Sequence, residues 1–185
     1  MANFTEKAIK ASFIKLLNQK PISKISVKDI VEDCGINRNS FYYHFSDIPA
    51  LLEEIITEVT SAIIAKYPAV NSLDQCFSAA FDFALENKKA AFHIYNSVSR
   101  DIFERELMKL CDYAVRTYVD SAFEGIDSGQ RDREVVLRFI KCSCFGLVID
   151  WLNNGMEDSS IDDLLRINKL CRGFSEEIIR RIRED

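Results

Sequence analysis

The sequence predicts an all-α protein with a small helical head near its N-terminus and a larger helical bundle behind it. Apolar residues recur with helical spacing along nearly all of the 185 residues, and β-type alternation of useful length is absent. Only three prolines occur, Pro21, Pro49 and Pro68, and capping residues precede the apolar stretches. We therefore expect a head over residues 1–47 and a bundle over residues 48–185.

The head is predicted to contain three helices, each with a recognisable start. Thr5 can cap the first helix. Ser26 begins the second helix in a Ser-x-x-Asp capping box with Asp29. Asn37 caps a third, short helix.

The bundle is predicted to begin with a long fourth helix. Ser46 or Asp47 caps it, and Pro49 lies in its first turn, where proline is tolerated. Pro68 ends this helix, and Ser72 begins the next one. Further helices are expected up to Phe123, from about 131 to 153, and from 160 to 183.

The segment SVKDIVEDCGINRNSFYYHF, residues 26–45, has the layout of a helix-turn-helix. A glycine in a three-residue turn between two short helices is typical of this motif. Gly35 takes the turn conformation at low cost because it has no Cβ. The alternative is an ordinary helical hairpin inside a bundle.

The third helix carries side chains that favour DNA recognition over a packing role. Arg38 and Asn39 suit bidentate contacts with guanine and adenine edges. Hydroxyl and imidazole groups nearby suit phosphates. These groups are supplied by Ser40, Tyr42, Tyr43 and His44. We therefore predict that this segment binds double-stranded DNA.

The charge distribution agrees weakly with that prediction. The whole chain has a net charge of −5, yet residues 1–28 carry six lysines and one acid, a net charge of +5. Residues 1–47 carry a net charge of +2, which leaves −7 for the remainder. A basic head on an acidic body fits a protein that presents one end to a polyanion.

Three stretches together resemble the signature of the tetracycline-repressor (TetR) family: residues 25–30, residues 34–36 and residues 41–45. The similarity covers about residues 5–55. It implies a homodimer that reads a near-palindromic operator with one third helix per half-site. It also implies DNA-contacting roles for a set of residues in the head. These are Arg38, Asn39, Ser40 and Tyr43 at bases or nearby backbone, Ser26, Tyr42 and His44 at phosphates, Lys28 at the groove edge, and Asn37 beside them.

The sequence departs from the family pattern just after this signature. Where the family often has a lysine, this chain has Asp47-Ile48-Pro49. A phosphate contact at this place must come from backbone N–H groups at the start of the fourth helix, or be absent.

The helix from about residue 131 is apolar on two faces, so both faces need cover. The body covers one face, and a second copy can cover the other in a four-helix interface with the last helix. The expected interface residues are Val136, Ile140, Gly146, Leu147, Trp151, Leu170, Phe174 and Ile178. The other face carries Val135, Phe139, Cys142, Gly146 and Ile149. The alternative is that both helices lie in the interior of a monomer.

Aromatic residues are concentrated between the head and these last helices. They suggest a site for a small apolar effector, at Phe77, Phe81, Tyr95, Phe103 and Tyr113. A closed aromatic core without a ligand is an equally good interpretation.

Several other kinds of protein are disfavoured by the sequence. The six cysteines lie among helical apolar positions, so we expect reduced, buried thiols and no metal site. Phosphate loops, zinc-protease motifs and nucleophile elbows are missing, so we expect neither an enzyme nor a cofactor. The chain shows neither a signal peptide nor a membrane span, which predicts a cytoplasmic protein.

These observations together predict a transcriptional regulator, a repressor released by a small apolar effector. The alternative is an activator, or a co-regulator or scaffold of the same fold, with no small-molecule effector.

Overall fold

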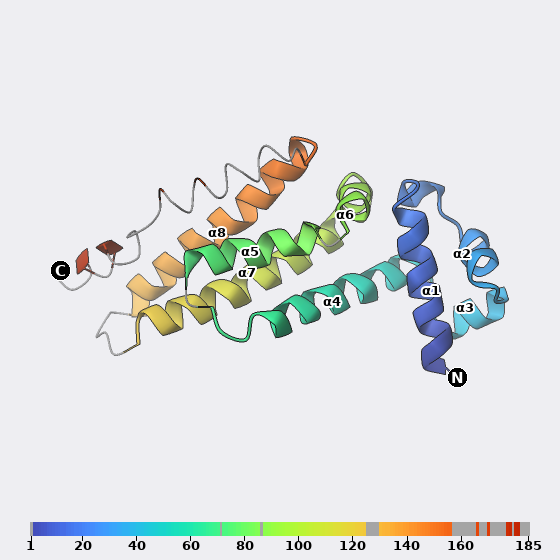
Figure 1. The fold of residues 1–185 in the computed structure, drawn as a ribbon, viewed down its shortest axis with the longest axis horizontal. Helices are drawn as coiled ribbons and strands as arrows, with labels where there is room; N and C mark the ends of the chain where they lie inside the picture. Colours follow the sequence, from blue (N-terminus) through green and yellow to red (C-terminus); the bar gives the residue numbers. More distant parts are fainter. Residues whose placement is uncertain are drawn as a thin grey trace. The chain divides into compact units, whose positions relative to one another are not determined.

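The computed structural model describes residues 2–70, 72–85, 87–124 and 130–156, together with Arg166, Leu170, Glu177, Ile178, Arg180 and Arg181. In these ranges every regular element is helical (Figure 1). The elements are α1 (Ala2–Leu17), η1 (Ile22–Lys24), α2 (Val27–Cys34), α3 (Arg38–His44), α4 (Ile48–Lys66), α5 (Leu73–Leu85), α6 (Lys88–Tyr95), α7 (Arg100–Ala122) and α8 (Gln130–Asn153). The all-α prediction is confirmed. The predicted last helix, 160–183, lies almost wholly outside the described residues.

Most predicted helix starts are confirmed by their capping bonds. Asp47 Oδ1 accepts a hydrogen bond from Ala50 N at 2.8 Å at the start of α4. Ser72 Oγ accepts one from Gln75 N at 3.3 Å at the start of α5. The predicted cap at Thr5 is wrong, because α1 already begins at Ala2 and Thr5 lies inside it.

The chain divides into two compact units. The first unit comprises Met1–Ser61 and Ala84–Glu106, and the second comprises Ala62–Phe83 and Leu107–Asp185. This division differs from the predicted boundary after residue 47. The reason is that α4 and α6 both bond to α1: His93 Nδ1 donates to the Leu17 carbonyl at 2.6 Å, and Lys10 pairs with glutamates of α4.

The first unit is built around one apolar core. α2 and α3 lie on the same side of α1 in Figure 1. Completely buried side chains from four helices fill the core: Phe13, Leu17, Ile30, Phe41 and Leu51. Each such side chain contributes about 1.5–3 kcal/mol relative to exposure. This core fixes the position of α3, although α3 is only seven residues long.

In the second unit α5, α7 and α8 pack together. Phe81 of α5 lies against Trp151 of α8, with ring centroids 5.3 Å apart. Cys76 of α5 donates its S–H to the Ala114 carbonyl of α7 at 3.6 Å. Lys141 of α8 pairs with Asp112 of α7 at 2.8 Å, so each pair of helices shares a side-chain contact.

The cysteines largely follow the prediction of reduced, buried thiols. Cys76, Cys111 and Cys144 are buried and free. Burial raises the pKa of Cys76 and of Cys111 to about 12, so these thiols stay protonated. Cys34 is half-buried. The prediction is wrong for Cys142 of α8, which is exposed. Cys171 lies outside the described residues.

Within the part of the chain that the structure describes, no helix is long and apolar enough to cross a membrane.

Candidate nucleic-acid interface

The turn between α2 and α3 depends on Gly35. Gly35 has φ +70° and ends α2 in the left-handed conformation, and its N–H donates to the Val31 carbonyl. The N–H of Ile36 donates to the same carbonyl at 3.0 Å. A Cβ at Gly35 would meet nothing within 4 Å, so glycine is favoured by its backbone conformation rather than by space.

The start of α2 is closed by a complete capping box. Ser26 Oγ accepts from Asp29 N at 3.2 Å, and the Ser26 N–H donates to Asp29 Oδ2 at 2.8 Å. The Ser26 hydroxyl also donates to Asp29 Oδ2, at 2.9 Å. These bonds from Ser26, with an ion pair to Lys20, lower the pKa of Asp29 to about 2. Ser26 therefore has no free donor, whereas the N–H groups of Val27 and Lys28 have no acceptor within the helix.

α3 is held in place by a cap at its start and by apolar residues along its inner face. Asn37 Oδ1 accepts from Ser40 N at 2.8 Å and from the Ser40 hydroxyl at 3.1 Å. Phe41 is completely buried, and Phe45, which follows the helix, is 3% exposed. The backbone N–H and the hydroxyl of Ser40 thus both donate to Asn37, and this pair of residues stabilises the start of α3.

The outer face of α3 is open to solvent. Arg38 and Asn39 in its first turn are exposed. Tyr43 is 81% exposed and Tyr42 is 55% exposed. His44 is half-buried, and its ring lies edge to face with that of Tyr43, with the ring centroids 5.1 Å apart. This surface combines Arg and Asn side chains with exposed tyrosine hydroxyls, and such groups can bond base edges and phosphates.

Most lysines of the head are already neutralised by acids. Lys15 pairs with Asp33 at 2.5 Å and Lys20 with Asp29 at 3.2 Å. Lys28 lies 3.7 Å from Glu32. Lys10 is bonded to three glutamates. Among the described residues of the head, the basic side chains without an acidic partner are Lys7, Lys24 and Arg38. The sequence does not reveal which basic side chains are paired, because partners such as Lys15 and Asp33 are 18 residues apart.

The start of α4 is a poor anion site. Of its first three residues, Pro49 has no N–H and the N–H of Ala50 is bonded to Asp47. Only the N–H of Ile48 is left without an acceptor in the helix. The Asp47 carboxylate adds a negative charge at the same place. Asp47-Ile48-Pro49, which replaces the lysine of the family pattern, therefore leaves only one backbone N–H for a phosphate contact here.

The residues predicted at a dimer interface fall into different environments. Ile140 and Trp151 are 3% and 2% exposed within their own chain, so they have almost no surface to offer a partner. Val136 and Leu147 are half-buried and Gly146 is exposed. Leu170 is 70% exposed and Ile178 is half-buried. Phe174 lies outside the described residues.

The second predicted stripe of α8 is the exposed one. Val135 is 60% and Phe139 56% exposed, and Cys142 and Gly146 are exposed as well. At 100° per residue these four side-chain positions share one face, opposite the buried face of α8. We call Val135, Phe139, Cys142 and Gly146 the outer face of α8.

The residues predicted to bind an effector are divided between the two units. Tyr95 and Phe103 belong to the first unit, where their rings meet edge to face at 6.2 Å, and both are 2% exposed. Phe77, Phe81 and Tyr113 belong to the second. Phe77 and Phe81 are buried, and the half-buried Tyr113 donates its hydroxyl to the Tyr67 carbonyl at 3.2 Å. His93 is half-buried, and its ring Nδ1 is bonded to the Leu17 carbonyl.

Two short helices, α2 and α3, joined by a turn at Gly35, with the second helix exposed on its outer face, have the layout of a helix-turn-helix. Residues 13–55 match the profile of bacterial regulatory proteins of the tetR family. Residues 71–173, more than half of the chain, match a transcriptional regulator C-terminal region of the same family. The chain belongs to the TetR family and is a DNA-binding transcriptional regulator.

The whole fold is similar to that of a solved relative. The structure described as "Dihydroxyacetone kinase operon activator DhaS" matches with a TM-score of 0.68 and 17% sequence identity, over 90% of this chain and 97% of that chain. At this identity the match shows the shared fold. No curated protein matches the chain significantly.

Proposed function

We propose that this regulator is a homodimer that binds a near-palindromic operator through the exposed face of α3. The observation that carries the proposal is the exposure of Arg38, Asn39 and Tyr43 on a helix fixed from behind by Phe41. Arg38 is the one lysine or arginine of α3, and it has no acidic partner among the described residues. We assign it to base reading, together with Asn39.

Phosphate contacts are assigned to groups that remain free. Tyr42 and Tyr43 present hydroxyls on exposed rings. The N–H groups at the start of α2 and the Lys28 side chain are available beside them, although Lys28 must loosen its long contact with Glu32. A contact from the Ser26 hydroxyl requires the hydroxyl to turn away from Asp29, so we assign Ser26 to capping first.

Selection from random DNA sequences tests the DNA-binding proposal. Arg38→Ala is expected to relax base preference at one position per half-site, because a good bidentate contact contributes about 1–3 kcal/mol of discrimination. Lys28→Ala is expected to weaken binding of all sequences evenly and to reduce the salt dependence. Equal sequence preferences for wild type and Arg38→Ala would contradict the base-reading role.

We propose the outer face of α8 as the main dimer contact contributed by that helix. Val135 and Phe139 expose apolar surface at the same face as Gly146, where a Cβ would meet nothing within 4 Å of its own chain. Glycine in mid-helix costs about 1 kcal/mol relative to alanine, so its presence favours close approach of a second backbone. At 100° per residue, this arrangement turns the predicted interface by about a third of a helix turn, away from Ile140 and Trp151.

For the regulatory outcome we propose a repressor released by a small apolar effector bound among the buried aromatics. A thermal-shift screen followed by operator titration tests this proposal. A compound that stabilises the protein and lowers operator affinity supports it. A compound that stabilises the protein without changing operator affinity contradicts the switch.

An activator or co-regulator without an effector is the second candidate, and two observations favour it. The similar solved structure is described as an operon activator. The small number of head lysines without acidic partners favours the co-regulator, which depends least on phosphate contacts. A promoter–reporter measurement separates the candidates: deletion of the regulator raises expression under repression and lowers it under activation.

A further inference from the structure

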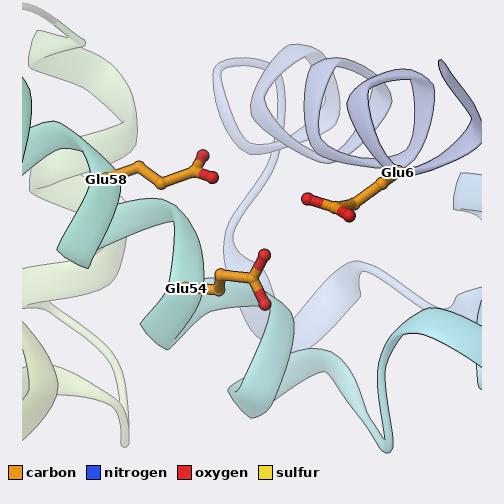
Figure 2. A group of neighbouring side chains, drawn as sticks. All are labelled: Glu6, Glu54 and Glu58. Carbon is orange, nitrogen blue, oxygen red and sulfur yellow. The ribbon is translucent and has the colours of Figure 1, made fainter. Parts of the chain in front are cut away.

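The first unit contains a lysine buried among three glutamates. Lys10 of α1 is 8% exposed. Its Nζ donates to Glu6 Oε1 at 2.6 Å, to Glu54 Oε1 at 2.5 Å and to Glu58 Oε1 at 2.8 Å. Figure 2 shows the three carboxyl groups pointing toward a common centre, one from α1 and two from α4. We call these four residues the Lys10 cluster.

The cluster is a joint between helices rather than a metal site. The three carboxylate oxygens lie within 4.8 Å of one another, a spacing that a cation could use. The Lys10 ammonium already bonds all three of them and supplies the positive charge. Burial alone lowers the pKa of Lys10, but the hydrogen bonds to the glutamates outweigh burial and raise the pKa above its ordinary value. Lys10 therefore stays charged and bonded at physiological pH.

The same ammonium group also reaches the end of the DNA-reading helix. Lys10 Nζ lies 5.8 Å from the centroid of the Phe45 ring, within cation–π range. Phe45 is the residue that ends α3, and its N–H donates to the Phe41 carbonyl. One side chain thus contacts α1, α4 and the residue that closes α3.

The bonds to α4 are directional in a way that apolar packing is not. Glu54 and Glu58 are four residues apart, so they lie on one face of α4, one turn above the other. A single Nζ that bonds both therefore favours the rotation and axial position of α4 at which both carboxylates reach it. The apolar contacts of α4, through Leu51 and Ile55, tolerate a small slide at lower cost, because dispersion has no preferred direction.

We propose that Lys10 is a positioning residue for operator recognition: it sets α4 relative to α1 and α3 and thereby the separation of the two α3 helices in the dimer. This inference rests on the proposed dimer. A dimer reads two half-sites about 34 Å apart, and one added base pair moves a half-site by about 3.4 Å and turns it by roughly 35°. A protein that fixes α4 strictly should discriminate sharply between half-site spacings. One with a loosened α4 should accept several spacings.

The test is operator binding as a function of half-site spacing. Wild-type protein and Glu54→Ala/Glu58→Ala are titrated against the operator and against versions with one base pair inserted or removed at the centre. This double variant keeps the Glu6–Lys10 pair, which lies within α1. We expect wild type to lose at least about tenfold in affinity at a wrong spacing, about 1.4 kcal/mol, and the variant to lose only two- to threefold. Base preference within each half-site should not change.

Lys10→Arg and Glu53→Ala serve as the comparison variants. Arg retains the charge and can bond carboxylates in pairs, so Lys10→Arg should retain the wild-type spacing preference. Glu53 lies beside Glu54 on α4 but pairs with Arg105 at 2.5 Å, so its loss should leave spacing preference unchanged. Lys10→Met removes the α1 partner of the same bonds, and a folded Lys10→Met protein should show the spacing preference of the double variant.

Each outcome decides one question. If the double variant binds more weakly than wild type by the same factor at every spacing, it keeps the wild-type spacing preference. The cluster then contributes to stability alone, and the positioning role is wrong. The role is wrong as well if the double variant binds as tightly as wild type and with the same spacing preference. If wild type shows no preference for a palindrome at all, the proposed dimeric operator binding fails, and the two failures are thereby distinguished.

Discussion

Replacing Asp47 by asparagine is expected to increase operator affinity. Asp47 caps α4 through Ala50 N at 2.8 Å, and asparagine is an equally good cap, so the fold should not change. What changes is the charge. A carboxylate stands where the family often has a lysine, next to the exit of α3, and in the proposed complex it repels the nearest phosphate.

The size of the effect follows from Coulomb's law. For two unit charges about 8 Å apart in water the repulsion is roughly 0.5 kcal/mol. Screening leaves about three quarters of it at 0.01 M salt and about one third at 0.15 M. With two half-sites, Asp47→Asn should raise affinity by about fourfold at low salt and by about twofold at physiological salt.

Fluorescence anisotropy with a labelled operator at the two salt concentrations measures this change. Asp74→Asn is the matched control, because Asp74 is an exposed acid in the first turn of α5, in the second unit. Asp47→Ala separates cap from charge: it should bind DNA more tightly yet lose about 1 kcal/mol of stability. An Asp47→Asn protein that binds no better than wild type at low salt would refute the reasoning.

Three further predictions concern stability and assembly. The pKa of Asp29 is lowered from 3.8 to about 2 by Ser26 and Lys20. The stabilisation by this carboxylate is therefore complete above pH about 4 and is lost as the pH falls through 2. Acid titration followed by circular dichroism should show this loss in wild type and not in Asp29→Asn. His93→Ala removes the bond to the Leu17 carbonyl and should lower the free energy of unfolding by about 1 kcal/mol in urea, whereas Asn96→Ala, which loses only a bond within its own turn, should cost less. Gly146→Leu should shift the protein from dimer to monomer in ultracentrifugation. It should not lower the stability of the chain, since a Cβ there meets nothing within 4 Å. Gly146→Ala should remain more dimeric, and a fully dimeric Gly146→Leu protein would show that Gly146 lies outside the interface.

The sequence by itself determined the elements whose causes are local. Capping boxes and glycine turns act over three to five residues, so Ser26, Gly35 and Asn37 could be read directly as the boundaries of α2 and α3. The pattern of apolar residues then fixed the all-α class and the outer, polar face of α3. Residue types on that face were sufficient to predict DNA binding, and three short stretches between residues 25 and 45 carried the resemblance to the TetR family.

The tertiary structure alone decided which charges remain available and which apolar face remains open. Lys10 and Glu58 are 48 residues apart in the sequence, and no local rule pairs them. Likewise, α8 is apolar on both faces, so its sequence could not tell the stripe of Ile140 and Trp151, buried by its own chain, from the stripe of Val135 and Phe139 that stays exposed. Helix periodicity gives the angle between side chains on one helix, whereas burial and ion pairing depend on which other helix lies opposite, and that is set only when the whole chain packs.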